Sequence, residues 1–352
     1  MKTIRIKAST EYDVLIGEGL LENAGKYAAK IVRPRLAAVI TDDNVAPLYL
    51  EKLCASLSAA GFETVEYIFP AGEASKNLTT YGKILEFLAE SRLSRTDLVF
   101  ALGGGVVGDM AGFAAATFLR GIKYVQIPTT LLAAVDSSVG GKTAIDLSVG
   151  KNLAGAFYQP SLVLCDPDCL RSQPQDVMRA GCAEVIKYGA YGNKRFLREV
   201  SKTPVPEQLE HVISVCVKMK AELVEADEFD TGARRMLNFG HSFGHAVEAC
   251  SNYEIPHGYA VSIGMAMISL AAALRGYCGM DVPAYLIDIL GGYGLPVHCP
   301  FGADELLDAL LSDKKMASGK MHLVVPTGVG SCEVMAVPVD ELREWLIDGG
   351  AA

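Results

Sequence analysis

The stretch Ala101-Leu-Gly-Gly-Gly-Val-Val-Gly-Asp109 has the pattern of a buried strand that runs into glycines and then into an apolar helix. Gly103, Gly105 and Gly108 match G-x-G-x-x-G, in which glycines let backbone amides approach a pyrophosphate at a helix N-terminus. Two features depart from the usual dinucleotide-binding fingerprint. The motif follows several predicted strands, and no acid suited to a ribose stands about 20 residues further on. The stretch therefore indicates either a nucleotide site or a tight strand-to-helix turn.

Strand-like and helix-like segments alternate around this stretch. The predicted strands cover residues 36–40, 64–69, 98–102 and 124–127. The predicted helices cover residues 48–60, 81–91 and 110–118. This alternation predicts an α/β domain with a Rossmann-like parallel sheet, which binds ligands at the carboxyl ends of its strands. After Pro167 the apolar residues recur at helical spacing, so we expect an α/β domain over residues 1–167 and a mainly α-helical domain over residues 168–352.

The composition is that of a globular protein, and its 352 residues are enough for two domains. A net charge of −9 argues against nucleic-acid and anionic-membrane partners, because either would require a basic face.

The nine cysteines are scattered, and the N-terminus has no apolar run, so we expect reduced thiols in a cytoplasmic protein. The segment from Pro256 to Leu274 carries no charge and approaches the length of a membrane span, but it contains His257; we expect a buried core helix.

Two histidines mark the second half of the chain, in Leu237-Asn-Phe-Gly-His-Ser-Phe-Gly-His245. His241 and His245 would share one face of a helix and could both bind one metal ion. No glutamate lies between them, which argues against an H-E-x-x-H metalloprotease. His257 is close in sequence, and Glu184 is a distant carboxylate that could either complete a metal site or form a structural ion pair. Histidines that are simply hydrogen-bonded in a core are the alternative.

A glycine-rich segment, Asp136-Ser-Ser-Val-Gly-Gly-Lys142, is followed by Lys151 and Asn152. Its end resembles a phosphate-binding P-loop, but Asp136 replaces the required earlier glycine, so we reject a Walker motif. Lysines on a flexible loop are typical of an anionic-substrate site. A solvated surface loop is the alternative.

Taken together and in order, these motifs resemble the 3-dehydroquinate synthase family of sugar-phosphate cyclases. The resemblance covers nearly the whole chain. Its strongest runs are Gly103 to Gly112, Phe118 to Ile122, Pro128 to Lys142, Lys151-Asn152, Ala183 to Lys187, Asn238 to His245 and Asp313 to Lys315. It implies that residues 1–167 form a nucleotide-binding α/β domain and that residues 168–352 form a helical metal- and substrate-binding domain.

The resemblance also implies ligands for particular residues. A divalent metal, zinc or alternatively cobalt, would be bound by Glu184, His241 and His257, while His245 would belong to the substrate pocket. The residues implied to contact NAD are Asp42, Asn44, Glu73, Lys76, Gly104, Gly105, Val106, Asp109, Thr129, Thr130, Lys142, Lys151 and Ser172. The residues implied to bind substrate are Asp136, Lys142, Asn152, Lys187, Lys220, Arg234, Asn238, His245 and Lys315. In a homodimer, Arg120 would reach the substrate phosphate of the neighbouring subunit.

The family's reaction converts 3-deoxy-D-arabino-heptulosonate 7-phosphate to 3-dehydroquinate and phosphate, a step of the shikimate pathway towards the aromatic amino acids. It implies that the partner is a sugar phosphate that carries a carboxylate. It also implies no net redox change, because NAD is regenerated in each turnover. Asp230, Tyr259 and Gln173 depart from the family's usual residues without removing an implied ligand. The alternatives are another sugar-phosphate cyclase, a metal- and NAD-dependent polyol dehydrogenase, and a nucleotide-sensing protein without catalysis.

Overall fold

The structure, a computed structural model, describes residues 1–312 and 319–352. The chain forms two compact units. Unit 1 consists of Met1–Pro174 and Leu209–Phe229, and unit 2 consists of Gln175–Gln208 and Asp230–Ala352. The chain therefore passes between the units three times. The expected boundary at residue 167, between a cofactor-binding and a metal-binding domain, concerns function and stays a prediction. The two packing units differ from that division chiefly because residues 209–229 belong to unit 1.

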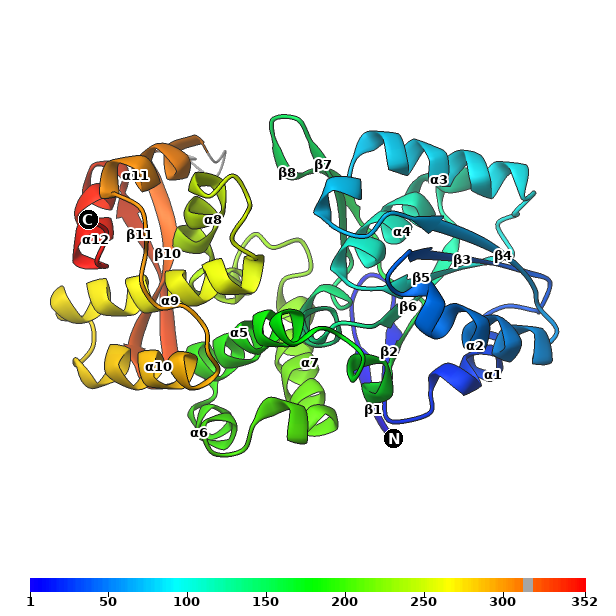
Figure 1. The fold of residues 1–352 in the computed structure, drawn as a ribbon, viewed down its shortest axis with the longest axis horizontal. Coiled ribbons are helices and arrows are strands. Elements are labelled where there is room, and N and C mark those ends of the chain that lie inside the picture. The colour runs from blue at the N-terminus through cyan, green and yellow to red at the C-terminus, as the bar shows by residue number, and fades with distance from the viewer. Residues whose placement is uncertain (313–318) are drawn as a thin grey trace. The chain divides into compact units, whose positions relative to one another are not determined.

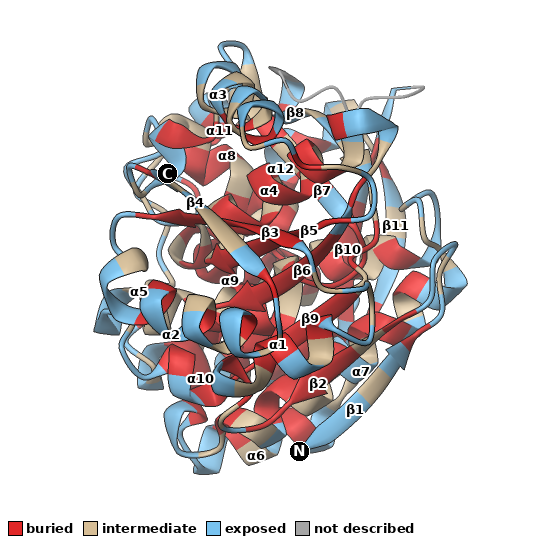
Figure 2. Ribbon diagram, turned by 90° about the vertical axis from the view of Figure 1, so that its right-hand side faces the viewer, coloured by how far each residue is buried: buried red, intermediate tan, exposed pale blue. Residues whose placement is uncertain are grey.

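Unit 1 is built on a seven-stranded sheet with the strand order β1-β2-β9-β6-β5-β3-β4. Its strands are β1 (Lys2–Ile6), β2 (Tyr12–Ile16), β3 (Leu36–Asp42), β4 (Glu63–Phe69), β5 (Leu98–Gly103), β6 (Lys123–Pro128) and β9 (Leu162–Cys165). All neighbouring pairs are parallel except β1 with β2, which is antiparallel. Every residue of β3 and β5 is buried, as expected for a parallel sheet covered on both faces (Figure 2).

Two apolar cores lie on the opposite faces of this sheet, because successive side chains of a strand point in opposite directions. Leu98, Phe100 and Leu102 of β5 belong to the core that also contains buried leucines of helix α2 (Ala46–Ala59). Val99 and Ala101 belong to the other core, with buried residues of α3 and α4. The helices of this part are α1 (Ala24–Ala28), α2 (Ala46–Ala59), α3 (Leu78–Glu90) and α4 (Gly105–Thr117).

Two further elements complete unit 1. Helix α7 (Leu209–Ala226) comes much later in the chain, yet it packs beside β1, and ion pairs join Lys2 to Glu210 at 3.8 Å and Lys7 to Glu225 at 3.3 Å. Strands β7 (Lys142–Leu147) and β8 (Gly150–Phe157) form a separate antiparallel hairpin (Figure 1).

Unit 2 is mainly helical. Its helices are α5 (Gln175–Gly192), α6 (Lys194–Lys202), α8 (His241–Cys250), α9 (His257–Leu274), α10 (Asp281–Gly292), α11 (Ala303–Ser312) and α12 (Leu342–Asp348). They accompany an antiparallel pair, β10 (Lys320–Gly328) with β11 (Ser331–Pro338) (Figure 1). Among the described residues, α9 is the one helix long and apolar enough to cross a membrane, and 72% of that segment is buried inside the protein. The prediction of a buried core helix is thus confirmed.

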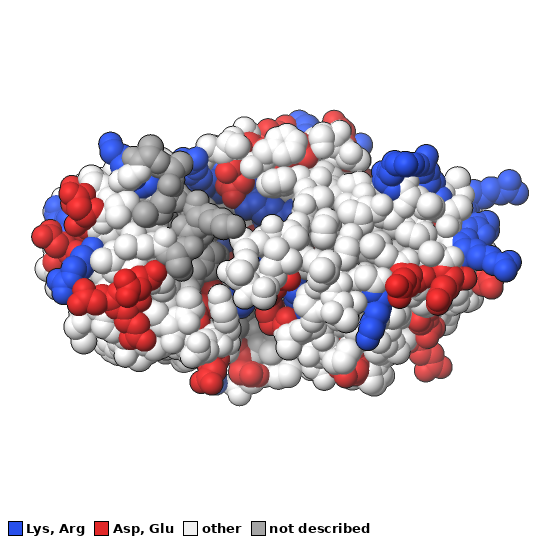
Figure 3. Space-filling view, turned by 90° about the horizontal axis from the view of Figure 1, so that it is seen from above, with Lys and Arg blue, Asp and Glu red and all other residues white. Residues whose placement is uncertain are grey.

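The predicted fold class, a parallel α/β part followed by a mainly helical part, is confirmed. Three details differ from the sequence-based expectation. Strand β1 adds an antiparallel edge, and α4 begins within the glycines at Gly105. The expected loop from Asp136 to Lys142 begins inside a short helical turn, Ala133–Ser137, is irregular only over residues 138–141, and leads into the β7–β8 hairpin. Figure 3 shows basic and acidic side chains interspersed over the face that it presents.

Candidate active site

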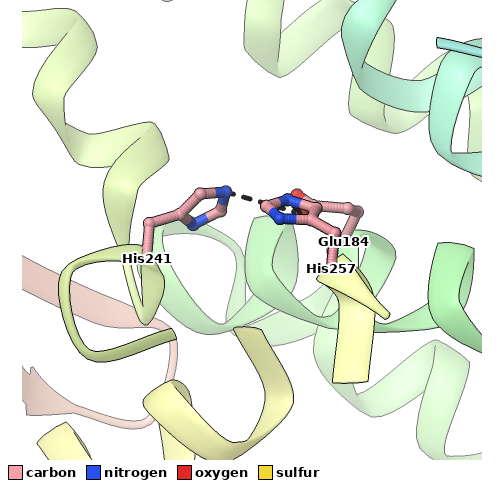
Figure 4. Close-up of side chains that lie close together, drawn as sticks. All are labelled: Glu184, His241 and His257. Atoms are coloured by element: carbon pink, nitrogen blue, oxygen red, sulfur yellow. Dashed lines mark ion pairs between the residues drawn. The ribbon is translucent and has the colours of Figure 1, made fainter. Parts of the chain in front are cut away.

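Three side chains with metal-binding groups meet in unit 2. Glu184 lies on α5, while His241 and His257 are the first residues of α8 and α9. Oε1 of Glu184 is 3.5 Å from Nε2 of His241 and 3.3 Å from Nε2 of His257, and the three donor atoms lie within 4.8 Å of one another. Figure 4 shows both imidazoles pointing towards the carboxylate. One carboxylate with two imidazoles suits zinc, and three protein ligands leave a coordination position open, as in catalytic sites.

The close packing of α8 and α9 brings the two histidines together. A Cβ atom on Gly264 of α9 would lie 2.0 Å from the carbonyl oxygen of Gly240 and 2.6 Å from the amide nitrogen of Gly244. Only glycine lets the two backbones approach this closely. Gly240 also has a left-handed conformation, with φ 77°, immediately before α8 begins at His241. Glycines on both helices therefore set the separation of the two imidazoles.

The two imidazoles differ in their electrostatic surroundings. Burial lowers the pKa of His241 to about 3, and the nearby ammonium of Lys187 acts in the same direction. Burial also lowers the pKa of His257, but hydrogen bonds and negative charge from Glu184 and Glu248 outweigh that effect and raise it to about 10. Without a metal, His241 is therefore neutral and His257 is protonated at neutral pH.

Glu248 is a functional candidate that the sequence analysis missed. It lies on α8, is 4% exposed, and its Oε2 accepts a hydrogen bond from Nδ1 of His257 at 3.2 Å. The same oxygen is 4.0 Å from Nε2 of His245. The spacing of His245 and Glu248, three residues apart on a helix, was a signal that could have identified this carboxylate.

The other implied substrate residues of unit 2 lie on neighbouring elements. Lys187 is fully buried on α5, and its Nζ is 2.5 Å from Oε2 of Glu184. Arg234, which is 1% exposed, and Asn238 belong to the turn Ala233–Asn238 that precedes α8. Lys315 lies outside the described residues.

The implied cofactor residues of unit 1 follow the carboxyl ends of adjacent parallel strands. Apart from Lys142 and Lys151 on the β7–β8 hairpin, they are Asp42 at the end of β3 and Asn44 after it, Glu73 and Lys76 after β4, Gly104, Gly105, Val106 and Asp109 after β5, Thr129 and Thr130 after β6, and Ser172 further beyond β9. These strands are neighbours in the sheet, so the residues lie along one edge. This edge is where ligands bind in open α/β sheets.

The glycine turn after β5 is tightly packed within the protein itself. A Cβ on Gly103 would lie 2.5 Å from Val107, and one on Gly108 would lie 2.7 Å from Oε1 of Gln126. Gly103 is therefore required by the turn alone, whether or not a phosphate binds, whereas Gly108 lies within α4 and packs against the end of the Gln126 side chain. Thr129 follows the neighbouring strand β6, and its amide donates to the carbonyl oxygen of Gly103 at 3.0 Å; its hydroxyl is buried and has no hydrogen-bond partner within the described residues. Such a group fits a site that a polar ligand completes.

Other cofactor candidates already serve the fold. The carboxylate of Asp42 accepts hydrogen bonds from the amides of Asn44 at 3.0 Å and Val45 at 2.9 Å. The hydroxyl of Ser172 is 2.5 Å from that of Tyr49. Asp42 and Ser172 therefore stabilise the protein structure at the carboxyl ends of the strands, in addition to lying where a cofactor would bind.

A buried lysine joins three segments of unit 1. Lys76 is 5% exposed, and its Nζ lies 2.6 Å from Oδ2 of Asp109 and 2.6 Å from Oδ1 of Asn152. Glu73 is 3.8 Å away. Burial lowers the pKa of Lys76, but the charges of Asp109 and Glu73 outweigh it and hold the pKa above its usual value. The structure thus places Asn152, an implied substrate residue, in contact with Lys76, an implied cofactor residue.

A second lysine of unit 1 reaches the helical turn Ala133–Ser137. Lys220 of α7 forms an ion pair with the carboxylate of Asp136 and donates to the Asp136 carbonyl oxygen at 2.7 Å. The remaining basic candidates lie on the surface or at the hairpin. Lys142 is exposed on β7, Lys151 is partly exposed on β8, and Arg120 is exposed.

These features define an enzyme class with a candidate nucleotide site on a parallel sheet and a candidate metal centre on a helical unit. Sequence profiles described as 3-dehydroquinate synthase N-terminal and C-terminal match residues 66–180 and 181–316. The chain is 42% identical to 3-dehydroquinate synthase of Streptococcus sanguinis (strain SK36) over 342 residues, or 95% of this chain and 96% of that one. The chain belongs to the 3-dehydroquinate synthase family and is an enzyme.

Two solved structures share the fold. One is 2-deoxy-scyllo-inosose synthase complexed with carbaglucose-6-phosphate, NAD⁺ and Co²⁺, with a TM-score of 0.88 and 25% identity over 98% of this chain and 99% of that one. The other is 2-epi-5-epi-valiolone synthase from Streptomyces hygroscopicus subsp. jinggangensis 5008 with NAD⁺ and Zn²⁺ bound. Its TM-score is 0.88, with 28% identity over 99% of both chains.

Proposed function

We propose that the enzyme converts 3-deoxy-D-arabino-heptulosonate 7-phosphate to 3-dehydroquinate and phosphate. The observation that carries this proposal is the cluster of Glu184, His241 and His257 in a chain that matches both halves of the family. This donor set suits a divalent metal acting on an alcohol. The buried lysines beside it and at the sheet edge suit an anionic substrate.

The residues of the chain would bind and orient the substrate. Lys187, Arg234 and Asn238 supply charge and hydrogen-bond donors for a carboxylate or a phosphate, and fixing the reacting groups accounts for a large part of catalysis. When bound by the residues along the sheet edge, NAD would supply reversible hydride transfer at the C5 alcohol, and a metal held by Glu184, His241 and His257 would supply Lewis acidity. The C5 ketone makes the C6 proton acidic, so phosphate leaves by β-elimination. Reduction, ring opening and an intramolecular aldol addition then close the carbocycle.

The finer assignments belong to the same proposal. We assign the metal to Glu184, His241 and His257, with zinc as the resident ion and cobalt as an alternative, since imidazole and carboxylate suit both. The residues along the sheet edge of unit 1 would hold NAD. The orphan hydroxyl of Thr129 and the partly exposed start of α4 support this assignment.

We further propose a cytoplasmic homodimer in which Arg120 reaches the substrate of the neighbouring subunit. Leu119, Arg120 and Gly121 have successive positive φ values of 51°, 65° and 123°, and the turn leaves Arg120 exposed. Left-handed conformations are unfavourable for Leu and Arg, and such strain is typical of functional turns.

The test is to supply the enzyme with NAD, zinc and each of three sugar phosphates, and to measure phosphate release. We expect turnover of the heptulosonate 7-phosphate and no accumulation of NADH. Exclusive turnover of glucose 6-phosphate or sedoheptulose 7-phosphate, which lack a carboxylate, would contradict the proposal and identify another cyclase. Stoichiometric accumulation of NADH would instead identify a polyol dehydrogenase.

A further inference from the structure

The β7–β8 hairpin is irregular beside one of its implied substrate residues. Its strands pair Ile145 with Ala154 and Leu147 with Gly150, so one residue of β7, Asp146, faces the three residues 151–153 of β8. Within this bulge Asn152 has a left-handed conformation, with φ 54°. Bulges interrupt the ladder of backbone hydrogen bonds and redirect a side chain, and they are frequent next to active sites.

The side chain of Asp146 replaces the interrupted ladder. Its Oδ1 accepts a hydrogen bond from the amide of Asn152 at 2.7 Å. Its own amide donates to the carbonyl oxygen of Lys76 at 2.8 Å, and Asn77 pairs with Asp146 as an isolated bridge. Asp146 is therefore attached through its backbone to the segment after β4, and through its carboxylate to the bulge.

The left-handed backbone of Asn152 directs its side chain to a functional partner. The Oδ1 atom of Asn152 accepts a hydrogen bond from Nζ of Lys76, the buried lysine that also contacts Asp109. If its amide lost its acceptor, the left-handed conformation of Asn152 would lose the hydrogen bond that selects it, and the backbone would be free to adopt other conformations.

We propose that Asp146 is a positioning residue, which holds Asn152 in the conformation that substrate binding requires and connects the hairpin to Lys76 of the cofactor site. This inference rests on the proposed function, in which Asn152 binds substrate and Lys76 contacts NAD. Asp146 also neighbours the carboxyl group of Glu73, an implied NAD contact. The experiment must therefore separate an effect through Asn152 from one through Glu73.

The experiment compares Asp146→Ala, Asp146→Asn, Asn152→Gly and the double variant Asp146→Ala/Asn152→Gly. Asp146→Asn keeps an oxygen that can accept the Asn152 amide, and Asn152→Gly keeps the left-handed backbone while removing the side chain. Ser148→Ala, at the exposed tip of the same hairpin, is the matched control and should behave as wild type. For each variant, KM and kcat are measured with the heptulosonate 7-phosphate, and the Kd of NAD by calorimetry.

We expect Asp146→Ala to raise KM by about tenfold, the loss of one well-formed hydrogen bond, with the Kd of NAD changed less than about twofold. Asp146→Asn should recover most of this loss, and the double variant should be no worse than Asn152→Gly. Any of three results would overturn the proposal. The KM of Asp146→Ala could equal that of wild type, the losses in the double variant could be additive, or Asp146→Ala could change only the affinity for NAD.

A readout without substrate keeps this inference separate from the proposed function. Hydrogen exchange at the Asn152 amide should be at least about tenfold faster in Asp146→Ala than in wild type, because the amide loses its acceptor. Equal exchange rates would contradict the positioning role even in an active enzyme. Conversely, wild-type protein that releases no phosphate from any heptulosonate would overturn the proposed function, while the exchange result would still decide the role of Asp146.

Discussion

The two ring nitrogens of His257 have different partners. Nε2 faces Glu184, while Nδ1 donates to the buried carboxylate of Glu248. A carboxylate in this place fixes the tautomer and the orientation of a metal-binding imidazole. We expect Glu248→Ala to weaken zinc or cobalt binding by about 10–100-fold, and Glu248→Gln to have a smaller effect. Titration of metal-free protein with Co²⁺ checks this; Asp288→Ala, an exposed change on α10, should leave affinity unaltered. Equal Co²⁺ affinity in Glu248→Ala would exclude an orienting role.

The raised pKa of His257 predicts that metal binding releases a proton. In the metal-free protein this imidazole stays protonated up to about pH 10, whereas His241, with a pKa of about 3, is already neutral. The apparent affinity for zinc should therefore rise by up to about tenfold per pH unit between about pH 7 and 9. Calorimetry in buffers of different ionisation enthalpy counts the protons. An affinity that does not change over this range would show that His257 is neutral before the metal arrives.

The same shift has a consequence for metal-free stability. A histidine whose pKa is raised from 6.5 to about 10 by folding stabilises the folded state fully below pH 6.5. This contribution is lost as the pH rises through about 10.

Residue spacing alone predicted part of the candidate site. The pair His241 and His245 is visible as an i, i+4 pattern, but the structure groups His241 with His257, 16 positions later, and with Glu184 on another helix. Local spacing cannot show a contact made by the packing of three helices. The sequence offered His257 and Glu184 as candidates beside the histidine pair, the resemblance selected Glu184, His241 and His257 as the ligand set, and their role as metal ligands remains a prediction. The resemblance did not supply Glu248 or Asp146, which act through neighbouring residues.

At the scale of elements, the contact between α8 and α9 sets the geometry of the candidate metal centre. A methyl group at Gly264 would collide with the backbone at Gly240 and Gly244, and neither can move without displacing α8. We expect Gly264→Ala to lower the free energy of unfolding by about 3 kcal/mol, the upper end for overpacking, and to weaken metal binding. Denaturant unfolding and metal content measure the two effects.

Gly291→Ala on α10 is the matched control for this change. A Cβ at Gly291 would meet no atom within 4 Å, and alanine is favoured over glycine in a helix, so this variant should be as stable as wild type or up to about 1 kcal/mol more stable. If Gly264→Ala had the same stability and metal content as Gly291→Ala, the close contact between α8 and α9 would not determine the distance between His241 and His257.

Regular elements of unit 1 were predictable because their patterns are local. The strands around residues 36, 64, 98 and 124 end within two residues of the predicted positions. The β7–β8 hairpin was not predicted, since its glycines and lysines have the composition of a loop. Its bulge depends on Asp146, and a contact between a side chain and a distant backbone leaves no periodic signal.

At the scale of the whole molecule, the candidate metal residues all belong to unit 2, and the implied NAD residues all belong to unit 1. The two sets share no residue, so removing one metal ligand deletes no implied NAD contact. We therefore expect His241→Ala to lose the metal and activity while the Kd of NAD stays within about threefold of wild type. Lys76→Met should show the reverse pattern, weakening NAD and retaining metal. Metal analysis and NAD titration of the two variants decide this, and stoichiometric zinc in His241→Ala would remove His241 from the ligand set.

The two-part architecture was predictable from the change in periodicity near residue 167. The place of α7 was not, because its sequence is that of an ordinary amphipathic helix and nothing local links it to the first part of the chain. It packs through buried apolar residues such as Val212, Ile213 and Val217, and its ion pairs from Glu225 to Lys7 and from Lys220 to Asp136 also join residues far apart in the sequence.

The late position of α7 also has a consequence for synthesis on the ribosome. Strand β1 is made first, but the helix that packs beside it is complete only when residue 226 has left the exit tunnel. During most of translation β1, which is an edge strand of the sheet, therefore lacks this neighbouring helix and could pair with another nascent chain. The positive charges of Lys2 and Arg5 on this strand and of Lys7 just after it oppose such pairing, and Lys2 and Lys7 later receive acidic partners from α7.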